Sequence, residues 1–166
     1  MTDIVRYDEI FKTPVGYIGI RRRGMTLKGL NFLGDHQPRA GNDYSPFEVN
    51  EIGQALASYF KRPGTANPPA TELEGTSFQL KVWNALASIP PGETRTYGDL
   101  ARELNTSPRA VGNACRANPI PIFIPCHRVV SRSGTGGFMG KTGGNEIRIK
   151  EWLLAHETQY QESGSI

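Results

Sequence analysis

Cysteine and histidine are scarce in this 166-residue sequence, which contains two of the first and three of the second. Cys115 and Cys126 do not form a CxxC pair and the histidines are scattered, so four ligands with the spacing of a zinc site cannot be assembled locally. We therefore expect no metal and no cofactor. A disulfide between the two cysteines is allowed by their number, but a reducing cytosol would disfavour it.

Long apolar runs are also missing. No segment approaches the roughly 20 apolar residues that span a bilayer, so we expect no membrane partner. The N-terminal residues include Asp3, Asp8 and Glu9, where a secretory signal needs a positive start and an apolar core. The sequence therefore predicts a cytoplasmic protein.

Basic residues are concentrated in one part of the chain. The segment 95–132 carries six arginines and two acidic residues, a local excess of +4 against a net charge of +3 for the whole chain. The planar guanidinium group suits contacts with phosphates and bases, which favours a nucleic-acid partner. A solvated basic surface explains the same charges equally well. The arginines are Arg95, Arg102, Arg109, Arg116, Arg128 and Arg132.

The first part of the chain has the pattern of short strands. Turn residues at Thr13–Gly16 and Arg23–Gly24 separate the apolar-rich runs, which favours an antiparallel meander. The expected strands span residues 4–11, 17–20 and 27–32. After a polar loop, a helix is expected with Ser45 as its N-cap, Pro46 at its first position and Glu48 completing a capping box.

Helices dominate the second part. Thr76, Thr96 and Ser107 each precede a short helical pattern, so we expect them to be N-caps. The expected helices span residues 77–89, 97–104 and 108–117, with a last helix from about residue 145. The two short helices between residues 97 and 117 form a helix-turn-helix candidate, a weak signal because many helix pairs look alike.

A linker separates the two parts. Residues 61–75 are rich in Pro, Gly and Thr, so we predict two domains, 1–73 and 74–166. The predicted fold class is α+β, with an N-terminal antiparallel sheet plus a helix and a mostly helical C-terminal domain.

Cys126 is the side chain that points most directly to chemistry. Prolines alternate with apolar residues over 119–130, which predicts a stiff, extended segment leading to Cys126. Its neighbours His127 and Arg128 favour a lowered thiol pKa and a reactive thiolate. A buried, inert cysteine fits the local sequence equally well. Cys115 lies on the apolar face of a predicted helix and is expected to pack in the core.

Several motifs resemble the O6-alkylguanine-DNA alkyltransferases, also called methylated-DNA–protein-cysteine methyltransferases. The segment Ile124–Val130 (IPCHRVV) is similar to the active-site signature of that family. The resemblance is dense over residues 76–157 and extends over the N-terminal half in architecture only. The further motifs are Thr94–Ala101, which resembles the first DNA-binding helix, Arg109–Ala114, the recognition helix, Asn118–Ile122, the asparagine hinge, and Lys150–Glu157, the closing helix.

The resemblance implies catalytic roles for four residues. Cys126 would accept the alkyl group, and His127 would act as its base through a bound water, giving a thiolate–imidazolium pair. Glu157 would orient and polarise His127. Asn118 would brace the site by hydrogen bonds across a turn.

The resemblance also implies which residues hold the substrate and the DNA. Tyr97 would donate a hydrogen bond to a ring nitrogen of the damaged guanine, and the main-chain carbonyls of Cys126 and Val129 would accept from its amino group. Arg109 would fill the gap that the flipped base leaves. Phe138 stands in the Gly-rich loop, residues 131–144, where the family usually has a tyrosine, so it can stack on the base but has no hydroxyl to donate. The other residues expected at the DNA surface are Thr96, Ala110, Arg95, Arg116 and Arg128.

The function implied is DNA repair by irreversible, single-turnover transfer of an alkyl group to Cys126 after base flipping. The substrate would be O6-alkylguanine, with O4-alkylthymine as a second candidate. The expected partner is double-stranded DNA containing alkylated bases, bound by a monomer without an obligate protein partner. The implied architecture is a ribonuclease-H-like first domain with a structural role and a winged-helix-like second domain with the helix-turn-helix.

Three other functions are compatible with parts of the sequence. A lesion-sensing module would mark damaged DNA without reacting, and such relatives lack the acceptor cysteine. A cysteine hydrolase would use Cys126 and His127 for many turnovers without DNA. A helix-turn-helix regulator would read a specific operator, usually as a dimer.

Overall fold

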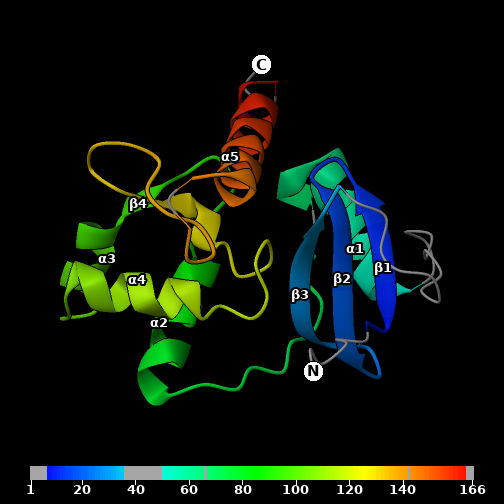
Figure 1. Ribbon diagram of the computed structural model, residues 1–166, viewed down its shortest axis with the longest axis horizontal. Helices are drawn as coiled ribbons and strands as arrows, with labels where there is room; N and C mark the ends of the chain where they lie inside the picture. Colours follow the sequence, from blue (N-terminus) through cyan, green and yellow to red (C-terminus); the bar gives the residue numbers. More distant parts are fainter. Residues whose placement is uncertain (1–6, 36–49, 66, 142, 164–166) are drawn as a thin grey trace. The chain divides into compact units, whose positions relative to one another are not determined.

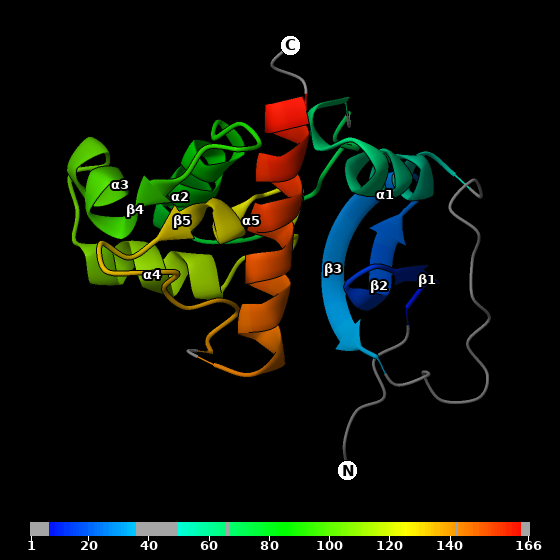
Figure 2. The same ribbon diagram turned by 90° about the horizontal axis from the view of Figure 1, so that it is seen from above.

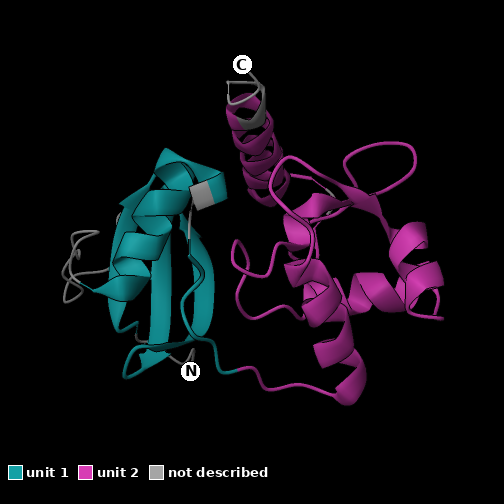
Figure 3. Ribbon diagram, turned by 180° about the vertical axis from the view of Figure 1, so that it is seen from behind, with its two compact units in different colours: residues 1–72 teal, residues 73–166 magenta. Residues whose placement is uncertain are grey.

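The computed structural model of the protein describes residues 7–35, 50–65, 67–141 and 143–163 (Figure 1). The chain divides into two compact units, residues 1–72 and residues 73–166 (Figure 3). Among the described residues, no helix combines the length and the apolar character that a membrane span requires.

Unit 1 contains a three-stranded antiparallel sheet in the order β1–β2–β3. The strands are β1 (Glu9–Thr13), β2 (Gly16–Arg23) and β3 (Thr26–Gly34). This arrangement confirms the predicted meander. Gly16 (φ 95°) and Gly24 (φ 58°) supply the left-handed backbone that the two connecting turns require. The predicted first strand began at residue 4, and residues 4–6 lie outside the described residues.

Helix α1 (Glu51–Lys61) lies along one face of this sheet (Figure 2). Apolar side chains from the helix and from all three strands are fully buried, and they form the core of unit 1. They include Phe11, Ile18, Ile20, Leu27, Leu30, Ile52 and Leu56.

Helix α1 begins later than the sequence predicted. Asn50 has an extended backbone, and its side-chain oxygen accepts a hydrogen bond from the amide of Gly53 at 2.9 Å, so Asn50 is the N-cap. The predicted start at Ser45, Pro46 and Glu48 lies outside the described residues. Because Asn50 has an extended backbone, the prediction of one continuous helix from Ser45 through Asn50 is wrong.

The helices of unit 2 begin where the sequence predicted. They are α2 (Ser77–Ala87), α3 (Tyr97–Glu103), α4 (Pro108–Arg116) and α5 (Asn145–Ser163). The side chains of Thr76, Thr96 and Ser107 each accept a hydrogen bond from the amide three residues later, which confirms the three N-caps. A turn with Asn105 in the left-handed region (φ 55°) joins α3 to α4 and completes the predicted helix-turn-helix.

Two short strands bring distant segments of unit 2 together. β4 (Arg95–Thr96) pairs in parallel with β5 (Val129–Val130), and neither strand was predicted. Strands of two residues are too short to show an alternating pattern in a sequence. Their pairing places Tyr97, the first residue of α3, close to the segment that contains Cys126.

Residues 119–125 form turns, so the prediction of a stiff, extended segment is wrong. The amide of Ile124 donates to the carbonyl of Ile120 at 2.9 Å, and Ile122 has a left-handed backbone (φ 78°). Proline fixes only its own φ near −65°, a value that turns and extended chains share. The prolines therefore do not decide between the two.

Candidate active site

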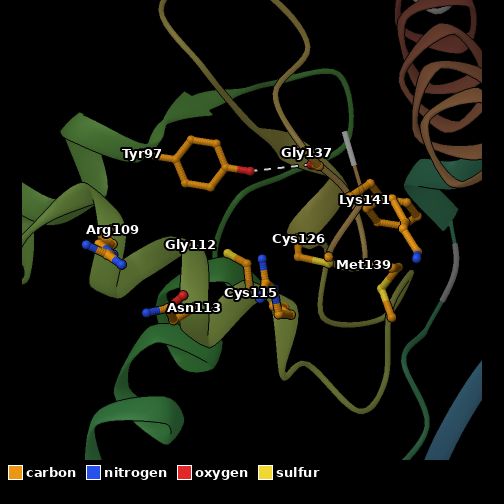
Figure 4. Close-up of a pocket in the computed structure, with 12 residues that line it drawn as sticks. Tyr97, Arg109, Gly112, Asn113, Cys115, Cys126, Gly137, Met139 and Lys141 are labelled. Carbon is orange, nitrogen blue, oxygen red and sulfur yellow. Dashed lines mark hydrogen bonds between the residues drawn. The ribbon is translucent and has the colours of Figure 1, made fainter. Parts of the chain in front are cut away.

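Cys126 begins a short 3₁₀ turn, η3 (Cys126–Arg128), and lines a cavity of about 410 Å³ (Figure 4). Pro125 has φ −81° and ψ 66°, and the amide of Cys126 donates to the carbonyl of Ile124 at 2.8 Å, which is the geometry of an inverse γ-turn. The Cys126 side chain is only 4% exposed. A reagent or substrate therefore has to enter the cavity to reach the sulfur.

The side chain of Asn118 closes the turn that leads to Cys126. Its Nδ2 donates to the carbonyl of Ile124 at 2.8 Å, and its Oδ1 accepts from the amide of Ile120 at 3.0 Å. Asn118 is buried, so each of these bonds satisfies a group that water does not reach. This position fits the bracing role expected of Asn118.

The buried carboxylate of Glu157 binds two residues of η3, His127 and Arg128. Glu157 comes from α5, and its Oε2 lies 2.6 Å from Nε2 of His127. Arg128 donates to the same carboxylate through Nε (2.8 Å to Oε1) and Nη2 (3.0 Å to Oε2). Burial alone would raise the pKa of Glu157, but the hydrogen bonds and charges of His127 and Arg128 outweigh it and hold that pKa well below its ordinary value.

His127 is arranged as a neutral base. An ionised carboxylate only accepts hydrogen bonds, so the Nε2 of His127 that faces Glu157 carries a proton. The Nδ1 of His127 is buried and has no hydrogen-bond partner among the described residues. Burial lowers the pKa of His127, while the bond to Glu157 opposes that shift. Its Nδ1 lone pair is therefore available to accept a proton.

The thiol pKa of Cys126 differs from the predicted lowering. Burial raises the pKa of this thiol to about 11, against opposing effects from the side chain of Asn118 and the charge of Lys150. Cys126 is thus a protonated thiol in this geometry. A reaction in which this sulfur acts as a nucleophile would require the thiol proton to leave before or during the attack.

Arg128 was expected at the DNA surface, and this expectation is wrong. Its side chain is only 8% exposed. Besides its two bonds to Glu157, it donates through Nη1 to the carbonyl of Ile89, just beyond the end of α2. The guanidinium group is thus occupied inside the protein.

Lys150 is a site residue that the sequence reasoning missed. It lies on α5, is fully buried, and donates through Nζ to the carbonyls of Val129 (2.6 Å) and Gly137 (2.8 Å). Burial lowers the pKa of Lys150 to about 8, while negative charge on Cys126 would raise it. Its spacing from Leu153 and Glu157 places all three on one face of a helix, which is the signal that would have found it. The carbonyl of Val129, expected to accept from guanine, therefore already binds this ammonium group.

Tyr97 and the Gly-rich loop form another part of the cavity wall. The hydroxyl of Tyr97 donates to the carbonyl of Gly137 at a long 3.4 Å, as Figure 4 shows. Burial raises the pKa of Tyr97 to about 12, so the hydroxyl keeps its proton. Gly136 (φ 76°) passes so close to Tyr97 that a Cβ there would lie 3.2 Å from the ring. Phe138 is buried and lines the cavity, where it was expected to stack on a base.

The residues expected at the DNA surface do not all form one group. Arg109 and Arg116 on α4 are exposed and line the cavity of Cys126. Arg95 forms an ion pair with Glu103 at 3.0 Å, and the hydroxyl of Thr96 caps α3. Ala110, also on α4, is half-buried and has no side-chain polar group.

Cys115 lines the same cavity as Cys126. It was expected only to pack in the core, and it is indeed buried, at 7% exposed. Both cysteines are free. Burial raises the pKa of Cys115 to about 12, so it is the poorer nucleophile of the two. Among the described residues, no three side chains of His, Cys, Asp or Glu group together as a metal site would require.

Comparison with known proteins gives concordant matches. The family described as "6-O-methylguanine DNA methyltransferase, DNA binding domain" matches residues 77–159. A methylated-DNA–protein-cysteine methyltransferase of Methanosarcina acetivorans is 38% identical over 156 residues, which cover 91% of this chain and 97% of that protein.

Solved structures are similar over the same extent. The O6-methylguanine methyltransferase of Mycobacterium tuberculosis matches with a TM-score of 0.74 and 34% identity, over 92% of this chain and 93% of that one. A structure of Mycobacterium tuberculosis OGT in complex with DNA matches over the same shares, with a TM-score of 0.73 and 32% identity.

The position of Asn118 leads to a stability prediction. Asn118→Ala leaves the amide of Ile120 without its partner and removes one donor from the carbonyl of Ile124. We expect the free energy of unfolding to fall by about 2 kcal/mol, the usual cost of an unsatisfied buried group. Urea unfolding followed by circular dichroism measures this loss. Asn113→Ala, an exposed amide on α4, is the control and should change stability by less than about 0.5 kcal/mol. Equal effects of the two substitutions would contradict the bracing role.

Proposed function

Because the chain belongs to the methylated-DNA–protein-cysteine methyltransferase family, we propose that it repairs DNA by transferring an alkyl group from O6 of guanine to its own Cys126. The observation that carries this proposal is the placement of Cys126. Its thiol lines a 410 Å³ cavity, and the next residue, His127, is a buried imidazole held by Glu157. A thiol that can accept an alkyl group and a base that can take the thiol proton are therefore adjacent in the chain.

The reaction is a displacement at the alkyl carbon. His127 takes the thiol proton through a bridging water, and the electron pair of the broken S–H bond stays on sulfur. The sulfur–carbon bond forms as the bond between carbon and O6 breaks, and the electron pair of that bond leaves on the base. The proton that His127 took from the thiol is then transferred to the guanine, so that guanine leaves as a neutral molecule.

Tyr97 assists the departure of the base. Its hydroxyl lies at the cavity wall and keeps its proton, since burial raises its pKa to about 12. A protonated hydroxyl can donate a hydrogen bond to a guanine ring nitrogen as negative charge develops there. The backbone carbonyl of Cys126 is the acceptor proposed for the guanine amino group. The carbonyl of Val129 is a second acceptor that Lys150 shares.

The product limits the protein to one reaction. Alkylated Cys126 is a thioether, which has no acyl carbon for a water molecule to attack. Acid–base groups such as His127 therefore do not regenerate the thiol. We propose stoichiometric, irreversible transfer, with O4-alkylthymine as a further substrate.

DNA binding is proposed to use the helix-turn-helix, α3 with α4. A base must leave the duplex to place its O6 substituent at the buried sulfur, and flipping costs a few kcal/mol. Arg109 is exposed at the cavity, where its side chain can fill the gap in the duplex. Contacts to phosphates supply most of the affinity and are largely indifferent to sequence, which suits a protein that searches for damage. The similarity to a mycobacterial structure in complex with DNA supports this partner.

The two units are proposed to divide the work. All the site residues named above come from unit 2, so residues 74–166 would form the DNA-binding and transferase domain, winged-helix-like in fold. Residues 1–73 would form a ribonuclease-H-like domain with a structural role. The protein is proposed to act as a monomer.

Replacing the acceptor tests this function most simply. Cys126→Ala should abolish transfer of a labelled methyl group from duplex O6-methylguanine, because it removes the thiol that precedes the base His127. DNA affinity, measured by fluorescence anisotropy, should be nearly unchanged. Cys115→Ala, the other thiol of the cavity, is the matched control and should still transfer the label. Transfer that survives in Cys126→Ala would remove this residue from the mechanism.

Arg109 gives a second prediction. Arg109→Ala should slow repair of duplex DNA by at least about tenfold, equivalent to ~1.4 kcal/mol, because the flipped state loses its filler. Reaction with free O6-benzylguanine requires no flipping and should change little. Arg148→Ala removes an exposed arginine of α5 and serves as the charge control. If Arg109→Ala slows both substrates equally, Arg109 does not act on the duplex.

A further inference from the structure

Arg128 joins three segments of unit 2 behind the active cysteine. It belongs to η3, binds both carboxylate oxygens of Glu157 on α5, and donates to the carbonyl of Ile89 just beyond α2. Arg128 and both of its partners are buried. A bidentate pair of this kind fixes both the position and the plane of a carboxylate. Arg128 therefore holds the Glu157 carboxylate in the position and plane in which it binds His127.

The carboxylate of Glu157 serves two donors at once. Its Oε2 accepts from Nη2 of Arg128 at 3.0 Å and lies 2.6 Å from Nε2 of His127. The charges of Arg128 and Glu157 cancel, so a positive charge on His127 would have no counter-ion left in this buried cluster. An unbalanced charge in a protein interior is strongly unfavourable.

We propose that Arg128 is a positioning residue that keeps His127 neutral, with its proton on Nε2 and its lone pair on Nδ1, until Cys126 gives up its proton. The inference rests on the proposed function, in which His127 is the base. When the proton moves from sulfur to Nδ1, the imidazolium and the thiolate appear together and balance each other. The positive state of His127 is thus coupled to the ionisation of Cys126.

The charges around His127 support this assignment. Glu157 and Lys150 face it from α5, Arg128 from its own turn, and Cys126 precedes it in the chain. Burial lowers the pKa of His127, Glu157 raises it, and the positive charges of Arg128 and Lys150 lower it. Without Arg128, Glu157 and His127 would form a neutral ion pair by themselves. Only burial and Lys150 would then oppose Glu157, so the pKa of His127 would rise and more of it would be imidazolium, which cannot accept a proton.

The test is a titration of the imidazole by ¹⁵N NMR in the wild type, Arg128→Gln and Arg128→Lys. The chain has three histidines, so His→Gln substitutions assign the signals. In the wild type, His127 should be neutral at pH 7 with the proton on Nε2. Arg128→Gln removes the charge and should raise the pKa of His127 by about one unit or more. Arg128→Lys keeps the charge and should leave His127 neutral at pH 7.

Two results would overturn the proposal. One is an imidazolium at His127 in the wild type at pH 7, and the other is an unchanged titration in Arg128→Gln. If Arg128→Gln does not fold, Arg128→Lys decides, because an imidazolium in that variant at pH 7 contradicts the role of the charge.

The activity readout is separate from the titration. In single-turnover repair, Arg128→Gln should move the acidic limb of the rate profile to higher pH, and Arg128→Lys should keep it in place. A limb that does not move contradicts the proposal. The NMR measurement uses no DNA, so a failure of the proposed function would leave the titration intact, whereas a failure of the present proposal would appear in the titration itself.

Discussion

The carboxylate of Glu157 binds two side chains of the same short turn, the imidazole of His127 and the guanidinium group of Arg128. These bonds tie α5 to η3 across about 30 residues of sequence, and they hold His127, the proposed base, beside Cys126, the proposed acceptor. A single buried negative charge thus orients His127 and neutralises Arg128. Removing Glu157 would leave three buried donor nitrogens, one on His127 and two on Arg128, without this acceptor. A buried donor without a partner costs more than a satisfied hydrogen bond contributes.

The Cys126 thiol is buried, yet it lines a cavity that a substrate group can enter. Burial keeps the thiol protonated and, in the proposed function, reserves its reaction for a group delivered into the cavity. The ammonium group of Lys150, bonded to Val129 and Gly137, links the strand after η3 to the Gly-rich loop. The wall of the cavity therefore depends on the same helix, α5, that supplies Glu157. Helix α5 thus positions both Glu157, which binds His127, and Lys150, which binds the wall of the cavity.

Local sequence rules predicted the meander and the helix starts of unit 2 because the decisive contacts lie within three residues, as in the cap from Thr96 to Asp99. They failed where partners are distant. The turn at 119–125 depends on the side chain of Asn118. Arg128 is buried because it binds the carboxylate of Glu157, a partner 29 residues further along the chain. A basic residue in an arginine-rich segment looks solvent-exposed until its partner is known. The resemblance to a family supplied the proposed catalytic roles, which composition and periodicity alone did not.

Transfer to Cys126, once per chain, is the central claim. Mass spectrometry of the intact protein and of its peptides, after mixing with a duplex containing O6-methylguanine, tests it most directly. The account predicts a gain of one CH2 unit on the peptide that contains Cys126, never exceeding one per protein however much damaged DNA is added. A protein that binds the damaged duplex and gains no mass, or that carries the methyl group on another residue, would contradict it.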